Sequence, residues 1–143
     1  MRDLRCVAPD GALLAHLHRH PDGTLTLVPE QGPPLTIRQP SPGAPILVHR
    51  ADELLGTVTP EDPTFTTRTF TARLGSTAWT VTANAFATRY RVTTPDDALV
   101  ATATHPVLSS TLTLTTSEPP TLLLAALTAT RAHRPAPTAY TPS

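Results

Sequence analysis

Three histidines at alternate positions, His16, His18 and His20, are the residues of this chain whose spacing most suggests a chemical site. Alternate side chains of a β-strand point the same way, so two or three imidazoles could bind one metal ion. One class of metal site that uses such a pair adds an acidic residue shortly after it and a later histidine, and here the next carboxylates along the chain are Asp22, in a turn, and Glu30. The alternative is that the histidines form the polar face of a half-buried strand. The sequence leaves both interpretations open.

Cys6 is the only cysteine, which excludes an internal disulfide and a zinc site built from several cysteines. With a histidine partner its thiol could act as a nucleophile, but a cysteine in a short apolar segment is more typical of packing. The chain contains no nucleophile elbow, phosphate-binding loop or dinucleotide fingerprint, and its acidic residues lie mainly in turns. The sequence therefore predicts no catalytic residue and no cofactor, and favours a protein that is not an enzyme.

Arg68, Arg73, Arg89 and Arg91 could form a basic patch on neighbouring strands, which would suit a lipid phosphate or a nucleic acid. The alternative is that they lie on solvated strand faces. The chain has 11 basic residues, all arginine, and 11 acidic residues, so its net charge gives no overall attraction to either partner. Aromatic side chains for base stacking are also few. We therefore expect no nucleic-acid binding and no stable membrane binding, and the partner is an unknown small molecule or protein.

One helix is expected to organise the fold, over residues 120–133. The apolar residues from Leu122 to Leu127 point in every direction around its axis, which is typical of a helix buried on all sides. Six apolar residues are too few to cross a bilayer, which takes about 20. We therefore expect the helix to be enclosed by the rest of a single domain over residues 1–134, with a disordered tail over 135–143. No basic segment followed by an apolar run opens the chain, so a cytoplasmic location is expected.

Short apolar runs separated by proline and glycine turns fill the chain before this helix. They predict ten to twelve short strands, with threonine on the outward positions and Gly56 marking a bulge or a close backbone approach. A barrel of about eight strands is filled by its own side chains, so enclosing a helix requires more strands or an open sheet wrapped round it. The predicted fold is mainly β: an antiparallel barrel-like sheet enclosing one C-terminal apolar helix. The aromatic residues expected in its core are Phe65, Phe70, Trp79, Phe86 and Tyr90.

This order of elements resembles the tubby C-terminal-like group, which includes the LURP-one-related proteins and the phospholipid scramblases. The resemblance covers residues 13–133 and is carried by RADELLGTV at 50–58, YRVTTPDDALVA at 90–101 and LLLAAL at 122–127. It implies a twelve-stranded barrel threaded by the C-terminal helix.

The resemblance also implies a class of function. Tubby proteins bind phosphoinositides through basic residues, whereas this chain has no lysine and its arginines are scattered. The cysteine-rich acylated segments of scramblases are missing as well. The resemblance to LURP-one-related proteins therefore predicts a non-enzymatic ligand-binding or scaffold domain. The alternative is a small metal-binding β-barrel that uses the His16-x-His18 pair.

Overall fold

The computed structural model describes residues 3–61 and 67–135, which form eleven β-strands and one α-helix. The helix, α1, spans Pro120–Ala132, so it ends one residue before the predicted boundary. The strands, in chain order, are β1 (Leu4–Val7), β2 (Leu13–Arg19), β3 (Leu25–Pro29), β4 (Leu35–Arg38), β5 (Ile46–Arg50), β6 (Glu53–Pro60), β7 (Thr67–Leu74), β8 (Thr77–Asn84), β9 (Arg89–Thr93), β10 (Leu99–Thr104) and β11 (Thr111–Thr116). The predicted order of strands followed by a single helix is confirmed.

The strands close into a barrel in which each one pairs with its neighbours in the sequence. Closure is made by the first and last strands, β1 and β11, which pair in parallel with Arg5 opposite Thr111. Every other pair of neighbouring strands is antiparallel. The predicted barrel is thus confirmed, with one parallel seam that the hairpin pattern did not indicate.

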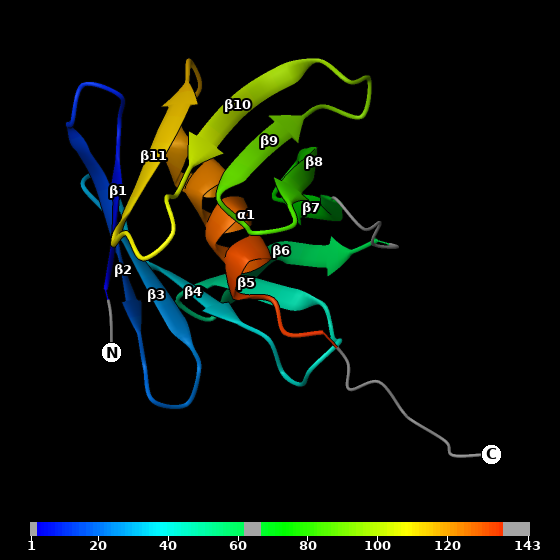
Figure 1. Cartoon of the computed structure of the whole chain (residues 1–143). Coiled ribbons are helices and arrows are strands. Elements are labelled where there is room, and N and C mark those ends of the chain that lie inside the picture. The colour runs from blue at the N-terminus through cyan, green and yellow to red at the C-terminus, as the bar shows by residue number, and fades with distance from the viewer. Residues whose placement is uncertain (1–2, 62–66, 136–143) are drawn as a thin grey trace.

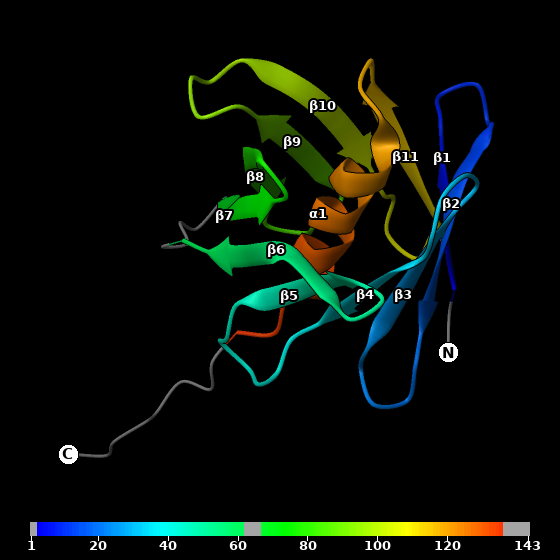
Figure 2. The same cartoon turned by 180° about the vertical axis from the view of Figure 1, so that it is seen from behind.

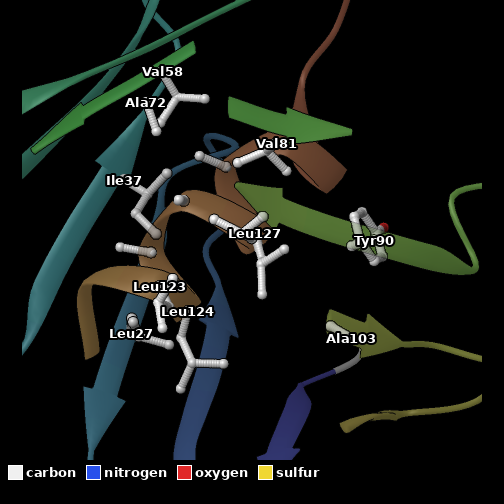
Figure 3. Close-up of a cluster of buried hydrophobic side chains, with 14 of the residues drawn as sticks. Leu27, Ile37, Val58, Ala72, Val81, Tyr90, Ala103, Leu123, Leu124 and Leu127 are labelled. Atoms are coloured by element: carbon white, nitrogen blue, oxygen red, sulfur yellow. The ribbon is translucent and has the colours of Figure 1, made fainter. Parts of the chain in front are cut away.

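Helix α1 lies inside this barrel, with strands around it in both views (Figure 1, Figure 2). Its residues Leu123, Leu124 and Leu127 are fully buried, and side chains from several strands surround them (Figure 3). The two polar side chains in the buried part of the helix form hydrogen bonds with the helix backbone. Thr128 donates to the Leu124 carbonyl at 2.7 Å, and Thr130 donates to the Ala126 carbonyl at 2.9 Å. A helix buried on all sides therefore keeps its hydroxyls paired within its own backbone.

Small inward-facing residues leave room for the helix. A helix with its side chains is about 10 Å across, so a barrel lined only by large residues would be too full to hold it. Many of the strand residues that face α1 are alanines, and the helix itself is rich in alanine where it is buried. The buried alanines of the strands are Ala15, Ala72, Ala83, Ala101 and Ala103.

Gly56 is a point of very close contact between β6 and β7. A Cβ atom at this position would lie 1.7 Å from the carbonyl oxygen of Arg73, so only glycine fits. The pairing with β5 also shifts here, because Val48 lies opposite Gly56 while His49 lies opposite Leu54. Both predicted features, the bulge and the close approach, are confirmed.

The exit of the helix is fixed by Gln39, in the connection between β4 and β5. Its side-chain amide donates to the Arg134 carbonyl at 2.9 Å and accepts from the Arg134 backbone N–H at 2.8 Å. The N–H of Gly43 donates to the same carbonyl. These bonds direct the chain out of the barrel immediately after the last turn of α1.

The aromatic core is smaller than predicted. Phe70, Trp79 and Tyr90 are buried as expected. Phe86 is 82% exposed, so its assignment to the core was wrong: it lies in the turn between β8 and β9. Phe65 and residues 136–143 of the predicted tail lie outside the described residues. Within the described part of the chain, no helix is long and apolar enough to cross a membrane.

Candidate functional site

A cavity of about 610 Å³ opens at the end of the barrel where α1 finishes. We call it the mouth cavity. It lies between the starts of β1 and β3, the end of β2, the β8–β9 turn and the β10–β11 connection. Its volume is within the range of small-molecule sites, about 300–1,000 Å³. The large apolar residues that line it are Leu4, Leu17, Leu25, Phe86, Val107 and Leu108.

Arg131, in the last turn of α1, supplies a positive charge to the mouth cavity. Its guanidinium forms no ion pair or hydrogen bond with the residues the structure describes. Burial raises the pKa of Cys6 and of Tyr90, each to about 12, and in both cases the charge of Arg131 acts in the opposite direction. The positive potential of Arg131 therefore extends into the barrel.

His105 is a buried polar residue in the wall of the mouth cavity. It is only 5% exposed, and its Nε2 atom has no hydrogen-bond partner among the described residues. Burial lowers the pKa of His105, and the charge of Arg131 lowers it further, although a bond to the Ser109 backbone opposes both effects. The imidazole is therefore neutral at pH 7, and its buried Nε2 is left without a hydrogen-bond partner among the described residues.

The rim of the cavity carries exposed apolar side chains. Phe86, Val107 and Leu108 are 82%, 70% and 83% exposed, and all three line the cavity. Ala87 and Leu108 also have positive φ angles, 55° and 65°. Residues other than glycine adopt this conformation mainly in tight turns, as Ala51 and Asp97 also do away from the cavity.

The β8–β9 turn is held in place by side chains of the flanking strands. Asn84 accepts the backbone N–H groups of Thr88 and Arg89, at 2.8 and 3.1 Å. The Tyr90 hydroxyl donates to the Ala87 carbonyl at 2.8 Å. These bonds fix the turn in the conformation that presents the apolar rim.

The three predicted metal ligands lie on the outer face of β2 and just beyond it. The rings of His16 and His18 are stacked with centroids 6.1 Å apart, and His18 Nδ1 lies 2.9 Å from a carboxylate oxygen of Asp3. His20 Nε2 instead lies 2.7 Å from the Thr26 hydroxyl. No group of three histidine, cysteine or acidic side chains within the described residues could hold a metal ion. Metal binding by the His16–His18 pair stays a prediction.

The four arginines of the predicted basic patch lie on β7 and β9, which are separated by β8. Arg89 and Arg91 alternate with buried apolar residues and face outward, and Arg73 also alternates with buried residues. Arg68 shares the alternation of the buried Phe70, so it extends from the inward face at the end of β7. Its charge lowers the pKa of nearby His133 and opposes the burial effect on Tyr90. Phosphate binding by these residues stays a prediction.

Cys6 is fully buried in β1. Because burial raises the pKa of its thiol to about 12, the reactive thiolate is not populated at neutral pH. Of the two interpretations of this residue, packing is the one that its environment supports.

No protein-family model, curated protein or solved structure matches this chain. The resemblance to the tubby C-terminal-like group therefore stays a prediction, and the barrel has eleven strands in the described residues rather than twelve. The mouth cavity was not predicted from the sequence. The signal that could have indicated this cavity is the presence of large apolar residues in turn segments: Phe86, Val107 and Leu108.

Proposed function

We propose that this chain is a non-enzymatic binding domain that takes a small, partly apolar molecule into the mouth cavity. The observation that carries the proposal is the composition of the cavity wall. Apolar and polar surface contribute nearly equally to the wall: the exposed apolar part comes mainly from Phe86, Val107 and Leu108, and Arg131 supplies a charge without an ion-pair partner among the described residues. A concave site that offers both apolar contact and a placed charged group suits a small amphipathic molecule.

The fold supports a binding role because it makes the cavity rigid. The strands that border it belong to a closed hydrogen-bonded ladder, and Gln39 fixes the chain just after α1. A site that is formed before the ligand arrives loses little entropy on binding. The resemblance to LURP-one-related proteins supports the same class of function.

A neutral fluorescent probe tests the proposal. N-phenyl-1-naphthylamine becomes bright in apolar cavities, and we expect it to bind the wild-type protein in a saturable way. Ala132 lines the cavity, so Ala132→Phe should fill part of it and weaken probe binding at least about fivefold. Ala98→Phe is the matched control, because Ala98 is exposed in the turn between β9 and β10 at the opposite end of the barrel.

Two further observations keep this test decisive. Should Ala132→Phe fail to fold by circular dichroism, Ser110→Trp replaces it, since Ser110 is an exposed residue at the rim of the same cavity. Lack of saturable probe binding to the wild-type protein, or equal weakening by Ala98→Phe, would refute the proposal.

A further inference from the structure

We propose that the ligand of the mouth cavity is an organic acid with one negative charge, whose carboxylate pairs with Arg131 and whose apolar body lies against the leucines of the wall. This inference rests on the proposed function and names the chemical class of the molecule bound there.

The charges in the cavity wall indicate a single negative charge on the ligand. Arg19 and Arg131 line the cavity together with one acidic residue, Asp3, and His105 is neutral. The two arginines and Asp3 sum to one positive charge in excess. Neither arginine has an ion-pair partner among the described residues, and Arg131 is the one whose charge reaches inward, since it acts on Cys6 and Tyr90 in the barrel. Arg131 is therefore the group assigned to the anion.

The charge at the helix end favours a singly charged carboxylate over a doubly charged phosphate. A guanidinium presents a planar fork of donors that pairs with the oxygens of either group, so the fork alone does not discriminate between them. The cavity lies at the C-terminal end of α1, where the helix dipole is negative, whereas phosphates prefer the positive N-terminal end. The helix end disfavours both anions, but the single charge of Arg131 balances a singly charged acid and leaves a doubly charged phosphate with a net negative charge beside the helix end.

The rest of the wall suits an apolar body. Leu4, Leu17 and Leu25 belong to the barrel core and form the inner surface, and Val107 and Leu108 form the rim. An acid whose charged group meets Arg131 would lay its hydrocarbon part against the rim, where Phe86, Val107 and Leu108 are exposed, and remove those side chains from water. Leu4, Leu17 and Leu25 are already buried and supply only van der Waals contact. Burial of apolar surface contributes about 25 cal/mol per Å², so the rim would supply the hydrophobic part of the affinity.

Displacement of the neutral probe by matched ten-carbon compounds tests the inference. Decanoate should displace N-phenyl-1-naphthylamine about five- to tenfold more tightly than 1-decanol, because only the acid gains charge-assisted hydrogen bonds. In Arg131→Gln this preference should fall to about twofold or less, while the probe itself still binds. Arg134→Gln is the matched control, since Arg134 is exposed and does not line the mouth cavity. It should keep the full preference.

Each outcome has a defined meaning. Equal binding of decanoate and 1-decanol to the wild-type protein, with probe binding intact, overturns the inference and leaves the proposed function standing. Tighter binding of decyl phosphate than of decanoate overturns the assignment to a singly charged acid. If Arg131→Gln does not fold, Arg131→Lys serves instead: it keeps the charge and loses the fork, and an unchanged preference for decanoate would refute bidentate pairing. Absence of probe binding refutes both proposals together.

Discussion

Replacing Leu124 by alanine measures how tightly the barrel encloses its helix. Leu124 is fully buried near the middle of α1, and its carbonyl accepts the Thr128 hydroxyl at 2.7 Å. Truncation removes three carbon atoms from the core and leaves a cavity. Leu→Ala substitutions at buried sites cost about 2.7–5 kcal/mol, and the larger values belong to sites that cannot collapse. Because the surrounding strands form a closed ladder, we expect a loss of about 4 kcal/mol in the free energy of unfolding.

Urea unfolding followed by the fluorescence of Trp79 provides the assay. Trp79 is the only tryptophan and is 6% exposed on β8, so its emission reports on the barrel interior. Leu122→Ala is the matched control: Leu122 is in the same helix but only partly buried, so its truncation should cost clearly less. Leu124→Asp would bury an unpaired carboxylate, and we expect that it prevents folding.

A small effect would refute the enclosed-helix fold. If Leu124→Ala lowers the free energy of unfolding by less than about 1 kcal/mol, the side chain is not confined as the structure shows. Cooperative unfolding of Leu124→Asp, with native Trp79 emission, would be equally damaging. Equal costs for Leu124→Ala and Leu122→Ala would show that the two positions are equally buried, which contradicts the structure.

Three other predictions concern the β6–β7 contact, metal binding by the histidines, and the pH dependence of stability. Gly56→Ala should strongly destabilise the barrel, because the new Cβ would overlap the Arg73 carbonyl; a variant with the wild-type urea midpoint would contradict this. Protein purified without a histidine tag should contain no stoichiometric zinc, iron or nickel; metal that disappears in the His16→Ala/His18→Ala double variant would establish the metal-binding alternative. The pKa of His105 is lowered from 6.5, so the unfolded chain binds more protons and stability should fall as the pH drops below about 6.5. His105→Asn should reduce this pH dependence of the urea midpoint, and an unchanged dependence would disprove the assignment.

The fold could be predicted from local patterns to a large extent. The apolar residues that surround the axis at 122–127 correctly indicated a helix with no solvated face, and the size of a helix correctly indicated more than eight strands. Gly56 was identified as a bulge or close approach because a glycine inside a strand usually marks one of these two features. Each of these predictions depends on residues that are near one another in the chain.

The parallel seam and the exposed phenylalanine could not be predicted by the same means. β1 and β11 are separated by almost the whole chain, so no local pattern pairs Arg5 with Thr111. Phe86 was assigned to the core from its residue type alone. Phe86 lies within the β8–β9 turn, which Asn84 closes by accepting the N–H groups of Thr88 and Arg89, so the phenylalanine is left outside the barrel.

The mouth cavity depends on the match between the lengths of the helix and the strands. The 13 residues of α1 span about 20 Å at 1.5 Å per residue, close to the height of strands of six to eight residues. The helix therefore ends within the barrel instead of projecting beyond its strands. Gln39 then draws the chain away to one side after Arg134, and the small side chain of Ala132 does not fill the space left beneath the last turn. Arg131 reaches that space because it lies in the last turn, so the same geometry that closes the core also places the charge of Arg131 at the mouth cavity, where we propose that the ligand binds.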